Sequence, residues 1–336
     1  TDGTPVQQYS DQYQAPRGIT VTSQNIDPLD RILADYPLCN VRMIVATDSS
    51  AILGIGDQGH GGLAICIGKL ALYTAGAGVS PFHTMPVNFD VGTDRKELLE
   101  DPDYLGMHEP RLKGDDYFAL LDRFIAAVKQ RWPKAIVQWE DFAKDVAFKV
   151  LERYRGRIAS FNDDIQGTGA VTLAGLSAAC KAKRESLVDQ RIVVVGAGAG
   201  GVGVAKAIQD GLVYEGLSRE LARRQMFVLD AAGLVVEGVS AQGYQLAVSQ
   251  FAATYADWSL QGDIPSLLEV IEQARPTVLL GLTGVAGLFK EPLVRRMASN
   301  TERPIIFPLS NPTANSEAIP QDLIAWSDGR AMVATG

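Results

Sequence analysis

This sequence has few cysteines and histidines, its net charge is negative, and it has no long uncharged apolar run. Its 336 residues include 3 cysteines and 3 histidines, and the formal net charge is −8 at pH 7. The acidic balance argues against a surface for nucleic acid or anionic membranes. No apolar run is long enough and free enough of charge to span a bilayer, and no signal peptide pattern is present. We therefore expect neither a nucleic-acid partner nor a membrane partner.

The three cysteines are too few and too widely spaced to form a disulfide framework. Cys39, Cys66 and Cys180 lie in apolar or small-residue surroundings, which favours buried, reduced thiols. Reduced thiols fit a reducing compartment. The default prediction is therefore a cytoplasmic enzyme.

The rest of the composition is that of a globular protein. Hydrophobic residues make up 46% and charged residues 21% of the chain, which is typical of a protein with a full core. The length predicts about two domains. The histidines (His60, His83 and His108) have no metal-ligand spacing and give no basis for a Ser-His-Asp site.

Predicted strands and helices alternate along the chain, which favours parallel sheets joined by right-handed crossovers. The predicted strands are residues 41–47, 52–55, 85–90, 135–139, 191–195, 226–230, 277–282, 304–309 and 331–335, with a short apolar run at 157–161. The predicted helices are residues 63–77, 117–131, 143–154, 166–183 and 266–273, and one from the glycine-rich turn after residue 195 through residue 208.

A dinucleotide-binding motif follows the apolar strand at residues 191–195. Gly196, Gly198 and Gly201 form a G-x-G-x-x-G pattern between a strand and a helix, which is the context the motif needs. Glycines allow the tight turn and let a pyrophosphate approach the amides of the helix N-terminus. The alternative is a glycine-rich turn without a ligand, which this context disfavours.

The choice between NAD and NADP depends on the end of the next strand. Asp230 ends that strand and is the acid expected to bind the ribose hydroxyls, although it comes later than usual because of an insertion at residues 214–224. No Lys or Arg occurs between Arg224 and Arg275, whereas an NADP site needs a cation near the ribose 2′ position. The sequence therefore favours NAD.

Two pairs of carboxylates follow predicted strands. Glu140-Asp141 comes after the strand at 135–139, and Asp163-Asp164 comes after the apolar run at 157–161. The carboxyl ends of parallel strands meet a ligand crevice, and oxygen ligands without His or Cys fit Mg²⁺ or Mn²⁺. The competing interpretation is that these acids are helix caps or solvated side chains. The Asp163-Asp164 stretch considered by itself favours a helix cap.

Lys69 is the one charged residue in the apolar helix predicted at residues 63–77. Its side chain either extends along the surface to reach solvent, as periodicity alone favours, or is buried with a lowered pKa that suits a general base. A carboxylate such as Asp163 beside it would orient the amine and also raise its pKa.

Nine sequence blocks make this chain resemble the malic enzyme family, in its bacterial NAD-linked form. They run in order across nearly the whole chain and together are highly specific. The blocks are ILGIGDQG (52–59), IGKLALYTAGAG (67–78), DVGTD (90–94), DPDYLG (101–106), QWEDF (138–142), FNDDIQGTG (161–169), VVGAGAGGVG (194–203), GLTGVAGLF (281–289) and LSNPT (309–313).

The resemblance implies an activity and a partner. The expected reaction is oxidative decarboxylation of L-malate to pyruvate and CO₂ with reduction of NAD, assisted by Mg²⁺ or Mn²⁺, in a homo-oligomer that is a dimer or tetramer. The expected metal ligands are Glu140, Asp141 and Asp164. Lys69 matches the family's general base, and Asp163 matches the acid beside it.

The resemblance also implies which residues hold the cofactor. The expected cofactor-binding residues are Gly196, Gly198, Gly201, Asp230 and Asn311, the last lying near the substrate and the nicotinamide. The predicted fold class is thus α/β with two parallel-sheet domains. Residues 17–162 are expected to form a substrate and metal domain, and 163–336 a Rossmann-type NAD-binding domain. Residues 1–16 are interpreted as the remnant of a truncated N-terminal domain, so the chain is expected to be a fragment.

Three departures from the family pattern leave alternatives open. The family's tyrosine acid belongs to a Tyr-Thr-Pro motif and is expected just upstream of Thr1, and the family's C-terminal segment is absent after Gly336. An arginine precedes the ILG block in most malic enzymes, but this chain has Ala51. Ala51 and Gly169 resemble malolactic enzymes, which convert malate to lactate with bound NAD, whereas the turn at residues 57–59 resembles ordinary malic enzymes. A catalytically incomplete NAD-binding fragment is the third alternative.

Overall fold

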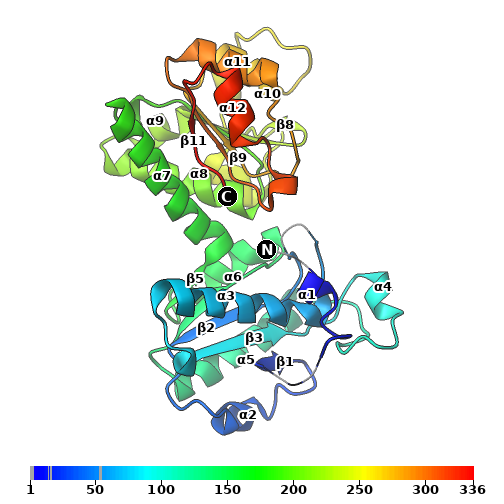
Figure 1. The fold of residues 1–336 in the computed structure, drawn as a ribbon. Helices are drawn as coiled ribbons and strands as arrows, with labels where there is room; N and C mark the ends of the chain where they lie inside the picture. Colours follow the sequence, from blue (N-terminus) through cyan, green and yellow to red (C-terminus); the bar gives the residue numbers. More distant parts are fainter. Residues whose placement is uncertain (1–3, 14, 16, 53–54) are drawn as a thin grey trace. The chain divides into compact units, whose positions relative to one another are not determined.

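The computed structural model describes residues 4–13, 15, 17–52 and 55–336. The chain divides into two compact units, an N-terminal unit of Asp2–Asp163 and a C-terminal unit of Asp164–Gly336. The described part of residues 1–16 belongs to the N-terminal unit, where Val6 is buried. Both units contain parallel sheets flanked by helices (Figure 1), which confirms the predicted α/β fold class.

The N-terminal unit is built on a five-stranded sheet with the order β1-β3-β2-β4-β5. Every neighbouring pair in it is parallel. The strands are β1 (Ile19–Val21), β2 (Met43–Thr47), β3 (Thr84–Phe89), β4 (Ile136–Trp139) and β5 (Ser160–Asn162). All six residues of β3 are buried, as expected for a strand covered on both faces.

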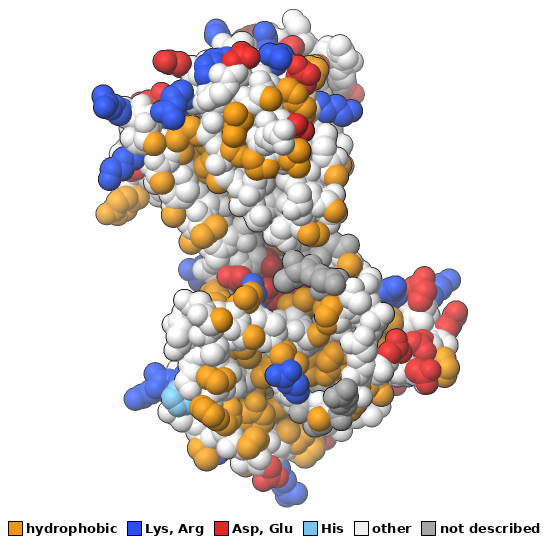
Figure 2. Space-filling view, in the orientation of Figure 1, with side chains coloured by type: hydrophobic (Ala, Val, Ile, Leu, Met, Phe, Trp, Pro, Cys, Tyr) orange, Lys and Arg blue, Asp and Glu red, His pale blue; other side chains and the backbone are white. Residues whose placement is uncertain are grey.

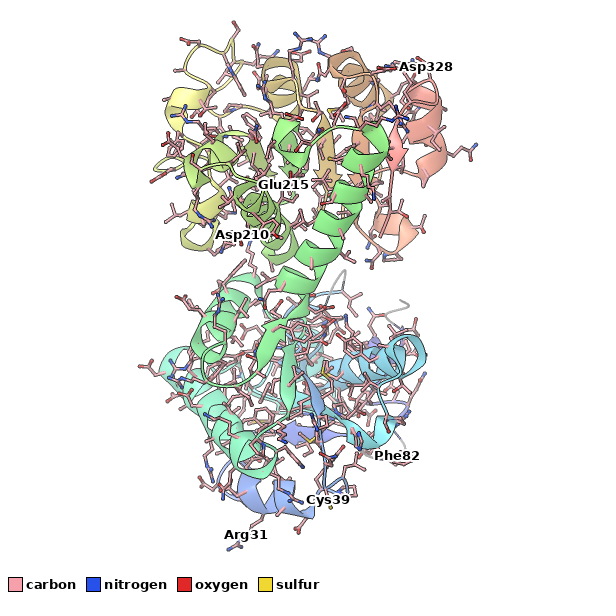
Figure 3. The ribbon with its side chains drawn as sticks, turned by 90° about the vertical axis from the view of Figure 1, so that its left-hand side faces the viewer. Arg31, Cys39, Phe82, Asp210, Glu215 and Asp328 are labelled. Carbon is pink, nitrogen blue, oxygen red and sulfur yellow. The ribbon has the colours of Figure 1, made fainter. Side chains whose placement is uncertain are left out.

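Helices cover both faces of this sheet. Figure 3 shows α3 on one side of the sheet and α5 and α6 on the other. The helices are α1 (Thr4–Gln7), α2 (Leu29–Asp35), α3 (Leu63–Ala77), α4 (Lys96–Leu99), α5 (Gly114–Arg131) and α6 (Lys144–Tyr154). The outer face of α3 remains apolar and exposed (Figure 2), and Leu72 on it is 62% exposed.

The C-terminal unit is built on a six-stranded sheet with the order β11-β10-β9-β6-β7-β8. All pairs are parallel except the β7–β8 edge pair. The strands are β6 (Ile192–Val195), β7 (Met226–Asp230), β8 (Gly233–Leu234), β9 (Val278–Gly281), β10 (Ile305–Pro308) and β11 (Met332–Val333).

Helices supply the rest of this unit's core. They are α7 (Thr168–Lys183), α8 (Ala199–Tyr214), α9 (Arg219–Arg224), α10 (Leu267–Ala274), α11 (Glu291–Asn300) and α12 (Pro320–Trp326). One core cluster joins β6 to α10 and α11 through residues such as Val193, Ile271 and Val294. Within the described residues, no helix combines the length and apolar composition that crossing a membrane requires.

Short helical turns connect these elements. They are η1 (Gly59–Gly62), η2 (Pro81–His83), η3 (Asp163–Gly167), η4 (Leu187–Asp189), η5 (Gly243–Val248), η6 (Ala252–Thr254) and η7 (Thr313–Asn315). The turn η3 has π-helical geometry and leads directly into α7. Part of the helix predicted at residues 166–183 is therefore this π-turn.

The predicted elements agree best where the apolar pattern is long. The helix predicted at residues 63–77 matches α3 at both ends, and Gly78 stops it with a left-handed φ of 70°. Of the strand predicted at 52–55, residues 53 and 54 lie outside the described residues, and Ile52 forms only an isolated bridge to Gly56. Three-residue β1 was not predicted because so short a segment has no readable period.

Candidate active site

Two of the three motif glycines in the turn between β6 and α8 are required by the backbone conformation and close packing of the turn. Gly196 has φ +111°, and a Cβ there would lie 2.3 Å from the Leu282 carbonyl oxygen. A Cβ at Gly201 would lie 1.6 Å from the carbonyl oxygen of Gly196. Side chains at either position would therefore break the turn.

Gly198 differs from these two glycines because the chain leaves open space beside it. It is the N-cap residue of α8, with φ −78°. A Cβ at Gly198 would meet no heavy atom of the described residues within 4 Å, apart from its chain neighbours. The amides at the start of α8 are thus accessible to an anion, as a pyrophosphate site requires.

Asp230 ends β7, the strand beside β6. Its Oδ1 accepts a hydrogen bond of 2.9 Å from the Ala232 amide, and it forms no salt bridge with any residue that the structure describes. Gln245 of η5, which sequence reasoning missed, donates from Nε2 to the Ala197 carbonyl oxygen at 3.1 Å and so braces the glycine turn. No pattern in the sequence indicated this contact, because Gln245 is far from the glycine turn in the chain and lies in a segment without clear periodicity.

The loops after β9 and β10 follow neighbouring parallel strands. Gly281 and Pro308 are paired in the register of these strands, so both loops begin at the same edge of the sheet. Asn311 is exposed in the loop after β10. In this unit, the sheet order therefore brings the glycine turn, Asp230 and the Asn311 loop to the carboxyl ends of β6, β7 and β10, which belong to the continuous run β10-β9-β6-β7.

A lysine lies between two carboxylates in the N-terminal unit. Lys69 Nζ is 2.8 Å from Glu140 Oε1 and 2.7 Å from Asp163 Oδ2. The lysine side chain is 24% exposed, so it does not extend into solvent as periodicity alone had favoured. Burial by itself lowers the pKa of Lys69, but attraction to Glu140 and Asp163 outweighs burial and raises the pKa above its ordinary value.

Two further residues of this cluster were missed by sequence reasoning. The Tyr73 hydroxyl donates to Gln138 Oε1, and Gln138 Nε2 donates to the second carboxylate oxygen of Glu140. Burial, followed by the charge of Asp163, raises the pKa of Tyr73 to about 12. The signals were the i,i+4 spacing of Lys69 and Tyr73 on α3 and the i,i+2 spacing of Gln138 and Glu140 on β4.

The four predicted carboxylates are not equivalent in the structure. Glu140 and Asp141 follow β4 and are only 5% and 7% exposed. Asp141 has a left-handed φ of 57°, which ends the strand alternation at that residue. Asp163 ends the N-terminal unit and Asp164 begins the C-terminal unit. Among the described residues, no three His, Cys, Asp or Glu side chains are grouped as a metal site.

The turn at residues 57–59 is held by an arginine that sequence reasoning did not single out. Arg111 donates to both carboxylate oxygens of Asp57, at 2.9 and 2.6 Å, and to the Asp48 carbonyl oxygen at 2.9 Å. Burial opposes ionisation of Asp57, but Arg111 and two backbone amides hold its pKa below the ordinary value. The guanidinium is therefore committed to the turn.

These features define a two-unit α/β protein with a dinucleotide-type glycine turn in one unit and a lysine–carboxylate cluster in the other. Residues 165–336 match the family model described as "Malic enzyme, NAD binding domain", and residues 1–155 match "Malic enzyme, N-terminal domain". The chain belongs to the malic enzyme family.

Curated relatives agree with this assignment. The NAD-dependent malic enzymes of Idiomarina loihiensis and Aliivibrio fischeri are each 47% identical to the chain over 337 aligned residues. That of Escherichia coli K12 is 46% identical over 337 residues. Each alignment covers 100% of this chain and 60% of the relative, so the chain spans about 60% of the length of these relatives.

Solved structures share the fold. Entamoeba histolytica malic enzyme aligns with a TM-score of 0.64 and 23% identity, over 94% of this chain and 57% of that chain. The NAD-dependent malic enzyme of Thermotoga maritima aligns with a TM-score of 0.63 and 21% identity, over 100% of this chain and 81% of that chain. At these identities the structural likeness supports the fold only.

Proposed function

We propose that this chain forms the substrate- and NAD-binding part of an enzyme that oxidatively decarboxylates L-malate to pyruvate and CO₂ with reduction of NAD. The observation that carries the proposal is the position of Lys69 Nζ, 2.8 Å from Glu140 and 2.7 Å from Asp163. A half-buried amine that two carboxylates orient at the ends of parallel strands is an arrangement suited to proton transfer with a hydroxy acid.

Lys69 is proposed as the group that takes the proton from the C2 hydroxyl of malate. When NAD is bound, its nicotinamide would take a hydride from C2 as that proton leaves the oxygen, so malate would lose two electrons and NAD would gain them. The bond from C3 to the C4 carboxylate would then break to release CO₂, its electron pair forming the enolate of pyruvate, and protonation of this enolate at C3 would give pyruvate. Asp163 orients the amine through its 2.7 Å hydrogen bond.

The chemistry of the carboxylates that follow β4 and β5 suits a divalent cation. Glu140 and Asp141 are consecutive buried carboxylates, and such hard oxygen donors suit Mg²⁺ or Mn²⁺. We propose that Glu140, Asp141 and Asp164 hold this metal. When bound, it would supply Lewis-acid polarisation of the substrate oxygen.

NAD is proposed to bind at the sheet edge of the C-terminal unit. Its pyrophosphate would lie against the amides of Gly198 and the start of α8, and Asp230 would accept hydrogen bonds from the ribose hydroxyls. The absence of a salt bridge to Asp230 among the described residues supports NAD over NADP. Asn311 is proposed to contact the nicotinamide side of the site.

Malolactic activity is the second candidate because Ala51 stands where most malic enzymes carry arginine. Gly169, the second residue that resembles malolactic enzymes, also has a packing role where α7 contacts α8. A Cβ there would lie 3.0 Å from both Ala207 Cβ and the Gly203 carbonyl oxygen. A larger residue there would require these neighbours to shift, so packing already favours a small residue at position 169.

Product analysis of the full-length protein with excess NAD and Mn²⁺ separates the two activities. NADH that accumulates together with pyruvate is the expected result. Lactate formed without net NADH would replace the proposal by malolactic activity. Failure of the protein to bind NAD in a titration would remove both.

A homodimer or homotetramer in the cytoplasm is proposed for the assembled enzyme. Leu72 on α3 and Phe82 in η2 are 62% and 73% exposed, and apolar side chains gather on this face (Figure 2). Exposed apolar surface of this kind favours association. Sedimentation equilibrium of the full-length protein tests the oligomer, and a monomer at micromolar concentration would contradict it.

A further inference from the structure

Glu317 is a fully buried carboxylate in the C-terminal unit. Its exposure is 0%, and in the part of the chain that the structure describes it forms no salt bridge. A buried carboxylate without a cation is unfavourable unless hydrogen-bond donors compensate its charge. The hydrogen-bond donors around Glu317 therefore indicate its structural role.

All four of these donors come from two residues. Glu317 Oε1 accepts from the Thr283 amide at 2.7 Å, the Thr283 hydroxyl at 2.7 Å and the Ser310 hydroxyl at 2.6 Å. Its Oε2 accepts from the Ser310 amide at 3.3 Å. Thr283 lies in the loop after β9 and Ser310 in the loop after β10, so one carboxylate joins the two loops.

The hydroxyl groups can only donate to this carboxylate. The Thr283 hydroxyl oxygen already accepts from the Val285 amide at 3.0 Å, and the Ser310 hydroxyl oxygen accepts from the Gly284 amide at 2.8 Å. Each hydroxyl proton is therefore directed at Glu317. The network is complete when the residue at position 317 is an acceptor at both oxygens.

The backbone carbonyl groups of Ser316 and Glu317 also bind the loop after β9. The Gly287 amide donates to the Ser316 carbonyl oxygen at 3.0 Å, and the Phe289 amide donates to the Glu317 carbonyl oxygen at 2.9 Å. Residues 282–289 are thus fixed at both ends by one short segment. The other loop carries Asn311 directly after Ser310.

We propose that Glu317 is a positioning residue that sets the two loops, residues 282–289 and 309–313, in the arrangement that receives NAD. The inference rests on the proposed function, because it assumes that NAD binds at this sheet edge. Glu317 acts through Thr283 and Ser310 and touches neither cofactor nor substrate. No motif position predicted this role for it.

The first test replaces one acceptor oxygen without changing the size of the side chain. Glu317→Gln puts an amide NH₂ against a donor and leaves that donor unsatisfied. We expect NAD to bind about ten-fold more weakly in a calorimetric titration. Amide hydrogen exchange should speed up in residues 282–289 and 309–313, while the β6–α8 turn keeps its protection.

A second variant displaces the Glu317 carboxylate without changing the residue at position 317. A Cβ at Gly281 would lie 2.6 Å from Glu317 Cδ, so Gly281→Ala pushes the carboxylate away from its donors. It should weaken NAD binding as Glu317→Gln does. Glu317→Ala removes the carboxylate and all three Glu317 atoms that the added methyl group would meet, so the double variant Gly281→Ala/Glu317→Ala should bind NAD no worse than Glu317→Ala alone.

Leu323→Ala is the matched control for simple loss of stability. Leu323 is fully buried on α12 in the same unit and contacts the core. Its truncation should lower the melting temperature but leave the NAD affinity and the exchange of both loops unchanged. If Glu317→Gln does not fold, Thr283→Val, which removes one hydroxyl donor, should give a smaller shift in the same direction.

The outcomes separate the two proposals. A wild-type protein that does not bind NAD would overturn the proposed function and this inference together. A wild-type protein that binds NAD, with Glu317→Gln and Gly281→Ala binding equally well and both loops equally protected, would overturn the inference alone. Weakened binding in Leu323→Ala to the same extent would also overturn it.

Discussion

At the scale of single residues, the proposed chemistry depends on charges that other charges compensate. Lys69 is held by Glu140 and Asp163, and Asp57 is held by Arg111. In each case burial opposes ionisation and a partner within hydrogen-bond distance restores it. Removing one member of such a group leaves the other uncompensated, which makes single substitutions informative.

Lys69→Ala should lower kcat of the full-length enzyme by about 10² to 10⁴, the usual contribution of a general acid–base group. NAD affinity should remain near wild type, because the glycine turn belongs to the other unit. Lys69→Arg is the matched variant, since it keeps the positive charge beside the carboxylates but cannot act as a base. Steady-state kinetics with full activity in Lys69→Arg would contradict the proposed role.

The Asp57–Arg111 pair should stabilise the N-terminal unit in a pH-dependent way. Although burial opposes it, hydrogen bonds from Arg111 and two backbone amides hold the pKa of Asp57 below its ordinary value in the folded protein, so the folded state favours the ionised form. The pair's contribution is therefore present above about pH 4 and is lost as the pH falls through the lower, folded-state pKa. Urea unfolding of wild type and Asp57→Asn measures it.

The expected difference in that experiment is about 3 kcal/mol at pH 7, as for a buried ion pair that loses one partner. It should shrink as the pH falls below about 4. Arg123 and Asp30 form an exposed pair with side chains 38% and 45% exposed, and Asp30→Asn serves as the control with a small effect. A pH-independent difference for Asp57→Asn would contradict the role assigned to its charge.

At the scale of elements, the β6–α8 turn separates glycines needed by the fold from a glycine needed by a ligand. Gly201→Ala should destabilise the unit, because its Cβ would collide with Gly196. Gly198→Ala has room in the protein and should keep the wild-type melting temperature. A methyl group there would instead meet a bound pyrophosphate, so NAD affinity should fall at least about ten-fold.

Gly262→Ala is the control for that experiment, because a Cβ at Gly262 also meets no described atom within 4 Å. It should change neither stability nor affinity. Calorimetric titration with NAD and thermal unfolding give both readouts. Equal NAD affinity in Gly198→Ala and wild type would remove the turn as the pyrophosphate site.

At the scale of the whole molecule, the proposed reaction depends on a divalent metal. Asp164→Ala should abolish Mn²⁺-dependent turnover of the full-length enzyme, because a carboxylate ligand is lost. A metal titration by electron paramagnetic resonance should show weaker Mn²⁺ binding, while NAD binding persists. Asp210 on α8 is exposed, and Asp210→Ala is the control; undiminished turnover in Asp164→Ala would refute the ligand assignment.

The sequence predicted the elements best where burial imposes a period. The apolar runs ending at Val195 and Asp230 predicted β6 and β7, and the long run at residues 63–77 predicted α3. The glycine motif predicted its own turn, because the backbone there tolerates no side chain at Gly196 or Gly201. Short elements such as β1 escaped because three residues fix no period.

The sequence by itself determined the α/β class, the two parallel sheets, the glycine turn and the family. These follow from local pattern and motif, which need no knowledge of distant contacts. Only the tertiary structure decided that Lys69 lies between Glu140 and Asp163, that Arg111 holds Asp57, and that Glu317 joins two loops. The physical reason is that such contacts depend on which strands are neighbours and how their ends are aligned, and local propensity carries no information about either.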